Sequence, residues 1–167
     1  MSIRSFEGKM PRIHPSAYVD REAVLIGDVE VGEECIILPG AVIRADHGTT
    51  KIGSRSNVQD NAVIHTNGVD IGEDVTIGHG AMVEARRIGN NSLIGINASL
   101  LADSDIGEFC LVAAGAVVKE GARVPPYSFV AGVPASVRPL KKEMAEHLKT
   151  ASELYTSMIP RYKSSLG

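Results

Sequence analysis

The chain has 167 residues, 17 of them glycine, with three phenylalanines, four tyrosines, no tryptophan and a formal net charge of −3. This length fits one domain with a hydrophobic core, and the weak charge gives no field that would attract nucleic acid or an acidic membrane. With so few aromatic residues, Ile, Val, Leu and Ala must fill the core, which indicates repeated small layers.

Targeting signals are not visible in the sequence. Residues 1–15 lack the apolar segment of a signal peptide, and no stretch is long enough to cross a bilayer. The only cysteines, Cys35 and Cys110, fall at small-residue positions of the repeat described next. We therefore expect a cytoplasmic protein with no membrane partner and with buried, reduced thiols.

Aliphatic residues recur at every sixth position over most of the chain. The residue after each of them is often glycine, and the residue four positions later is usually small, as at Ala41, Ala62 and Ala81. An α-helix cannot keep one apolar face at a period of six, whereas short strands joined by turns can. The period predicts an all-β solenoid, a β-helix built on these positions: Val19, Leu25, Val31, Ile37, Ile43; Ile52, Val58, Ile64; Ile71, Ile77, Val83; Ile88, Ile94, Leu100, Ile106, Val112, Val118, Val124 and Val130.

The period is broken at three points. Ile43 to Ile52 is nine residues, which predicts about three extra residues that bulge out within residues 47–50. Ile64 to Ile71 is seven residues and Val83 to Ile88 is five. Because loops on a rigid scaffold often carry binding groups, these irregularities bracket a candidate site.

The C-terminal segment has a different pattern. Turn residues at 124–126 and 131–135 mark the end of the last coil, that is, the last complete turn of the β-helix. Apolar residues then recur at spacings of three and four, which predicts a helix over about residues 139–158 that Pro160 stops or kinks. We therefore divide the chain into a β-helix domain, 1–138, and a C-terminal helix, 139–167, that packs along the β-helix. The apolar residues expected to make that contact are Leu140, Met144, Leu148, Ala151, Tyr155 and Met158.

Stacked coils place equivalent residues one strand spacing apart, about 4.8 Å. The period puts Arg44, His65 and Glu84 in one column, and Asp60 and His79 in another. His65 and Glu84 are then close enough to chelate one metal ion. His79 lies on a different face and reaches them only across an interface, as in a closed ring of three protomers with a site at each junction.

Three stretches, GAVIRADHGTTKIGSRSNVQDNAVIHT, IGEDVTIGHGAMVE and IGNNSLIG, resemble the γ-class carbonic anhydrase family of the hexapeptide-repeat superfamily. The resemblance covers nearly the whole chain, including the AGVPA turn and the C-terminal helix. It implies a left-handed parallel β-helix, a homotrimer, and a zinc-dependent lyase. That lyase would hydrate CO2 reversibly to bicarbonate by means of a metal-bound hydroxide.

The resemblance also implies roles for individual residues. His65 would bind the metal from one protomer and His79 from its neighbour, while Gln59 and Asp60 would orient water and bicarbonate. Arg44 and Asp46 would pair at the trimer contact, and a tyrosine of the tail, here Tyr155, approaches the metal in some relatives.

One position departs from the family pattern, because Glu84 stands where the third zinc histidine is expected. Either Glu84 binds the metal or His47, in the insertion, replaces the missing histidine. Against these, Glu84 could pair with Arg44, Arg86 or Arg87, and His47 could be a solvated loop residue. A carboxylate ligand makes the metal a poorer Lewis acid, so CO2 hydration would be weak. Two imidazoles and a carboxylate also suit iron, cobalt or nickel.

Two other functions remain open at this point. Many hexapeptide-repeat proteins are acyltransferases, which have a catalytic histidine beside a groove between the prism-shaped β-helices of neighbouring protomers. Binding of a CoA thioester is a variant of that function. A non-catalytic, metal-binding trimeric scaffold is the other alternative, and Glu84 is the residue that favours it. Fold alone does not choose among them.

Overall fold

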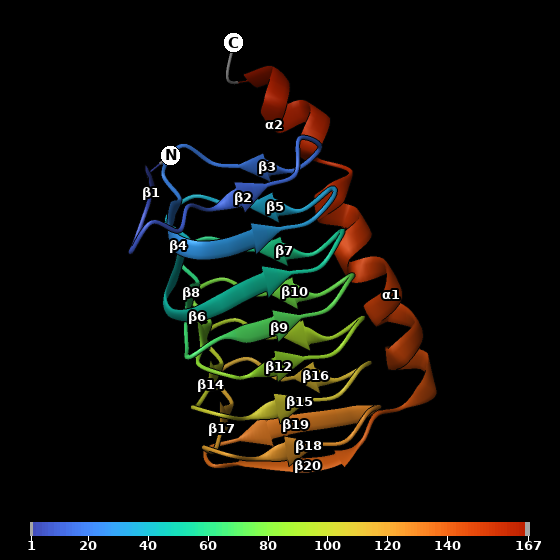
Figure 1. Ribbon diagram of the computed structural model, residues 1–167. Helices are drawn as coiled ribbons and strands as arrows, with labels where there is room; N and C mark the ends of the chain where they lie inside the picture. Colours follow the sequence, from blue (N-terminus) through green and yellow to red (C-terminus); the bar gives the residue numbers. More distant parts are fainter. Residues whose placement is uncertain (1, 166–167) are drawn as a thin grey trace.

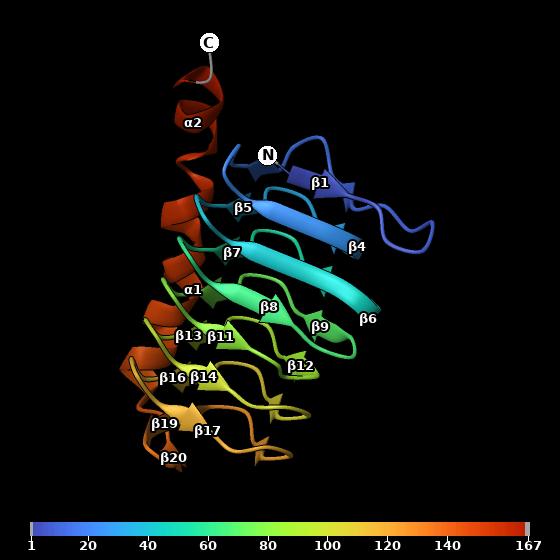
Figure 2. The same cartoon turned by 90° about the vertical axis from the view of Figure 1, so that its left-hand side faces the viewer.

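The chain winds into a parallel β-helix, each coil passing through three faces (Figures 1 and 2). The computed structural model describes residues 2–165. Equivalent strands of successive coils pair in parallel register, as where Ile77 lies beside Val58 on one side and Ile94 on the other. The predicted solenoid with a C-terminal helix is confirmed.

The strands form two sheets, because β4 and β6 turn a corner and join two of the faces into one sheet. That sheet contains β1 (Ser2–Arg4), β2 (Arg12–Ile13), β4 (Val24–Val31), β6 (Val42–Ile52), β8 (Val63–His65), β9 (Val69–Ile71), β11 (Met82–Val83), β12 (Arg87–Ile88), β14 (Ser99–Leu100), β15 (Asp105–Ile106), β17 (Val117–Val118) and β18 (Arg123–Val124). The other contains β3 (Tyr18–Val19), β5 (Ile36–Ile37), β7 (Asn57–Val58), β10 (Thr76–Ile77), β13 (Leu93–Ile94), β16 (Leu111–Val112), β19 (Ser128–Gly132) and β20 (Ala135–Pro139).

The core is the interior of the prism, where the aliphatic residues of the six-residue period stack coil on coil. Ile43, Ile64 and Val83 are fully buried and lie in register. Burying each such side chain stabilises the fold by roughly 1.5–3 kcal/mol relative to leaving it exposed. Cys35 and Cys110 occupy small-residue positions as free, buried thiols. Burial raises the pKa of Cys35 to about 11 and also raises the pKa of Cys110, so both thiols stay protonated.

The outward side chains of the three faces differ in character. On the charged face they alternate in sign from coil to coil, in the order Arg12, Glu30, Lys51, Asp70, Arg87, Asp105, Arg123. On the apolar face they are mostly aliphatic and only partly covered within the protomer: Val24, Val42, Val63, Met82, Ser99 and Val117. The third is the helix-covered face, against which α1 (Lys142–Thr156) and α2 (Ile159–Ser165) lie (Figure 1).

The C-terminal helix differs from the sequence prediction at its start. The helix begins at Lys142 instead of 139, because residues 135–139 form β20, which pairs antiparallel with β19. At the other end, α1 stops at Thr156 and a second helix, α2, begins at Ile159, so the helix is interrupted just before Pro160. Pro160 lies in the first turn of α2, where a proline lacks no needed hydrogen bond. The buried side of α1 is made by Ala145, Leu148 and Ser152, while Met144 is exposed. Neither helix is long and apolar enough to cross a membrane.

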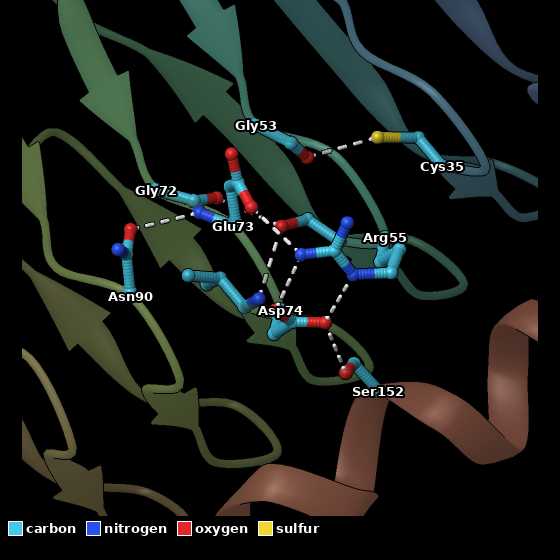
Figure 3. A network of polar contacts seen from close by, with 10 residues as sticks. Cys35, Gly53, Arg55, Gly72, Glu73, Asp74, Asn90 and Ser152 are labelled. Atoms are coloured by element: carbon cyan, nitrogen blue, oxygen red, sulfur yellow. Dashed lines mark hydrogen bonds and ion pairs between the residues drawn. The ribbon is translucent and has the colours of Figure 1, made fainter.

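A polar network ties α1 to one corner of the prism (Figure 3). Arg55 donates to Asp74 from Nε at 2.9 Å and from Nη2 at 2.8 Å, and Nη2 also lies 2.7 Å from Glu73. Ser152, fully buried on α1, donates to Asp74 at 3.4 Å. The hydrogen bonds of Arg55 with Asp74 and Glu73 raise the pKa of Arg55, so the guanidinium stays charged. The network thus contacts α1 at Ser152, one turn before Tyr155.

Candidate metal centre

The insertion in β6 creates the first cluster of site residues. Gly27 of β4 pairs with Ala45 and Val29 pairs with Thr50, so residues 46–49 lie opposite Asp28 alone. The predicted excess of about three residues is therefore present. It does not bulge out as a loop, however, because β6 continues as a strand through all of these residues.

Two contacts hold the insertion in this extended path. Thr49 Oγ1 donates a hydrogen bond to Asp28 Oδ2 at 2.7 Å. The Asp28 carboxylate also accepts hydrogen bonds from Lys9 and Arg12, at 3.1 Å each. On the other side, a Cβ at Gly48 would collide with the carbonyl group of Asn67. Glycine is thus needed for the insertion to lie against the next coil.

Replacing Asp28 by asparagine should destabilise the protein at about pH 7 and do so less at a pH below 3.8, the ordinary pKa of the group. Hydrogen bonds from Thr49 and Lys9 lower the pKa of Asp28 below its ordinary value of 3.8, although burial raises it. A lowered pKa means that the stabilisation is complete above the ordinary value and is lost as the pH falls through the folded-state value. Urea midpoints of both proteins at the two pH values test this; an equal difference at both would contradict it.

Asp46, His47 and His65 meet where the apolar face turns into the charged face. The register of β6 and β8 sets Arg44 beside His65, as the period predicts. Asp46 Oδ1 lies 3.0 Å from His65 Nε2 and 3.9 Å from His47 Nε2, and Asp46 Oδ2 lies 3.6 Å from Arg44 Nε. Burial raises the pKa of Asp46, but the hydrogen bond with His65 and the charge of Arg44 bring it below its usual value. Asp46 is therefore an ionised carboxylate between two imidazoles.

Glu84 follows Val83, whose partner in the preceding coil is Ile64, so it belongs to the column of His65 as the sequence indicates. Its carboxylate is nevertheless not among the donor atoms that cluster with His65. The arginines considered as its partners are engaged elsewhere, Arg44 with Asp46 and both Arg86 and Arg87 with Asp105. Within residues 2–165, Glu84 is half-buried and makes no ion pair.

The second cluster lies at the opposite edge of the apolar face. Asp60 follows β7 and His79 follows β10, and His79 Nδ1 lies 2.8 Å from Asp60 Oδ2. Tyr155 of α1 is nearby: burial raises its pKa, and the charge of Asp60 adds to this. Gln59 is buried and donates to Asn57 at 3.1 Å.

The site residues expected from the sequence therefore divide between two edges of one face. Arg44, His65 and Glu84 lie at one edge, together with the insertion, while Asp60 and His79 lie at the other. The sequence did not assign Asp46 as a possible ligand, although it stands next to His47. The only signal for this was the carboxylate directly before a histidine in the irregular segment.

Comparisons with known proteins agree with this architecture. The family model for bacterial transferase hexapeptide (six repeats) matches residues 10–45 and 87–120. Carnitine operon protein CaiE of Escherichia coli (strain K12) is 35% identical over 99% of this chain and 87% of its own length. The chain thus belongs to the hexapeptide-repeat superfamily, as a γ-class carbonic anhydrase-like member with a left-handed β-helix.

Two solved structures match over nearly their whole length. A hexapeptide transferase family protein from Anaplasma phagocytophilum has a TM-score of 0.93 at 30% identity, covering 96% of this chain and 98% of its own. A Bacillus cereus protein provisionally assigned as an acetyltransferase has a TM-score of 0.92 at 34% identity, with coverages of 98% and 97%. A perosamine N-acetyltransferase from Caulobacter crescentus, a point mutant in complex with CoA and GDP-perosamine, matches less fully. Its TM-score is 0.58 at 26% identity, with coverages of 77% and 56%.

Proposed function

We propose that the protein is a metal-dependent hydratase that interconverts CO2 and bicarbonate at the junctions of a homotrimer. The observation that carries this proposal is the placement of two carboxylate-bound histidines, His65 and His79, at opposite edges of one face. In a closed ring, opposite edges of neighbouring protomers meet. Each junction would then combine His65 of one protomer with His79 of the next.

The apolar face supports the trimer. Its outward residues are aliphatic in most coils, and Met82 in the middle is 39% exposed. Leu101, 36% exposed, extends the column of His65 and Glu84, since the backbone N–H of Glu84 donates to the carbonyl of Leu100. The other two faces are occupied differently, because the charged face carries alternating charges and α1 and α2 lie against the helix-covered face. An exposed apolar strip of this length is typical of a self-association surface.

The residues at the two edges fit a transition-metal ion. Asp60 holds Nδ1 of His79 and leaves Nε2 free to face a neighbour, which is how a metal-binding imidazole is commonly oriented. A bound divalent ion would lower the pKa of water enough to supply a nucleophile near neutral pH. Glu84, half-buried and without an ion pair in the described chain, is the carboxylate placed to accept the proton.

The test is metal content together with CO2 hydration on the purified protein. We expect a trimer by light scattering, about one transition-metal ion per protomer, and hydration that chelation abolishes and added metal restores. A protein that carries no metal after reconstitution, or that hydrates CO2 no faster than buffer, would refute the proposal.

Acyl transfer is the second candidate, and the pairing of His79 with Asp60 favours it. A histidine whose Nδ1 faces a carboxylate 2.8 Å away is oriented to act as a general base through Nε2. The perosamine N-acetyltransferase structure contains CoA. Calorimetry with acetyl-CoA distinguishes the two functions. Binding that survives chelation and is lost in His79→Ala would favour acyl transfer, whereas no binding would remove this candidate.

A further inference from the structure

The donor atoms of Asp46, His47 and His65 already have nearly the spacing of a metal site. They all lie within 4.8 Å of one another. Ligands at 2.0–2.2 Å from a tetrahedral ion are about 3.4 Å apart. The two separations involving Asp46 Oδ1, 3.0 Å to His65 and 3.9 Å to His47, bracket that value. Small side-chain rotations of His47, which is 63% exposed, would equalise them.

The surroundings fix the carboxylate in the orientation that a ligand needs. The side chain of Asp46 is only 14% exposed, and Arg44 lies at its Oδ2, so that Oδ1 faces both imidazoles. Groups that orient a metal ligand in this way commonly increase metal affinity. Gly48 and the contact between Thr49 and Asp28 fix the strand that carries Asp46 and His47. All these groups come from one protomer.

We propose that Asp46, His47 and His65 of a single protomer form a complete three-donor set for a divalent first-row transition ion. The proposal rests on the proposed function for the role of the site, and it changes where the ligands come from. His79 of a neighbour adds to an ion that the protomer already holds, and Glu84 is not a ligand. Two imidazoles and one carboxylate are a donor set that leaves coordination positions open for His79 and water.

Titration of metal-free protein with Co²⁺, followed by its visible absorption, tests the ligand set without an activity assay. His47→Ala is expected to weaken Co²⁺ binding roughly 10-fold or more. Because the side chain of His47 is mostly exposed, this variant should fold normally. Asp46→Asn should lose binding more completely. Glu84→Gln is the matched control, because it lies in the column of His65 but outside the cluster, and its affinity should equal that of the wild type.

The outcomes separate this inference from the proposed function. If His47→Ala binds Co²⁺ normally and Glu84→Gln does not, the ligand set is wrong, although a metal-dependent hydratase remains. If His79→Ala loses Co²⁺ entirely, the protomer does not hold the ion alone, and the inference is also overturned. Normal Co²⁺ binding without CO2 hydration would refute the proposed function and leave the metal site in place. Circular dichroism and size-exclusion profiles confirm that each variant is folded and assembled.

Discussion

Mixing the His65→Ala and His79→Ala variants should restore CO2 hydration that neither variant has alone. Each variant by itself removes one imidazole from every junction, and we expect hydration to fall roughly 100-fold or more. In a mixed trimer, an intact His65 from the His79→Ala protomer can face an intact His79 from the His65→Ala protomer. Random assembly makes about a quarter of the junctions complete.

The experiment compares co-refolded variants with the same variants mixed after assembly, using stopped-flow hydration of CO2. Only the co-refolded sample should recover activity. His147→Ala is the matched control, because His147 is an exposed histidine of α1 whose Nδ1 lies 2.7 Å from the carbonyl oxygen of Glu143. It should hydrate CO2 at the wild-type rate. Equal activity in the two mixtures would show that no site is shared between protomers.

The sequence predicted the parts of the fold that depend on the six-residue period. Because each period places one residue inside, the inward positions and the columns follow directly from counting, and the pairing of Arg44 with His65 is confirmed. The buried, free cysteines follow from the same rule, since both occupy a position where only small side chains fit.

Counting residues could not predict the path of the backbone where the six-residue period is interrupted. Nothing in the spacing shows that residues 46–49 continue as strand, because that path depends on contacts with Asp28 and with the carbonyl of Asn67. For the same reason the proximity of Asp46 to both histidines was missed. The helix begins later than its apolar spacing indicates, because residues 135–139 form β20, which pairs with β19.

The three faces of the prism explain how such a regular fold can hold a specific site. Alternating charges suit one face to water, and two helices cover another. Among the faces formed by residues 2–165, the apolar face is the one that we assign to the proposed trimer contact, and both histidine clusters lie at its edges. The assembly proposed here and the site proposed here thus depend on the same surface.

Replacing Ile64 by alanine is expected to produce the largest loss of stability among single core substitutions at the site. Ile64 is fully buried between Ile43 and Val83 and directly precedes His65. The cavity left by the deleted side chain costs about 2–5 kcal/mol of unfolding free energy. Because each coil of a solenoid is stabilised by its neighbours, the loss should also loosen the strand pairing that positions His65.

Urea unfolding followed by circular dichroism measures this loss. Val137→Ala is the control, because Val137 is a β-strand residue that is 47% exposed, and its replacement should change stability by no more than about 0.5 kcal/mol. The Ile64→Ala variant should also bind Co²⁺ less tightly than wild type at a temperature where it is still folded, since His65 is then less firmly placed. Equal unfolding free energies for the two variants would mean that the coil around Ile64 is not close-packed, and that the register of β6 with β8 does not depend on it.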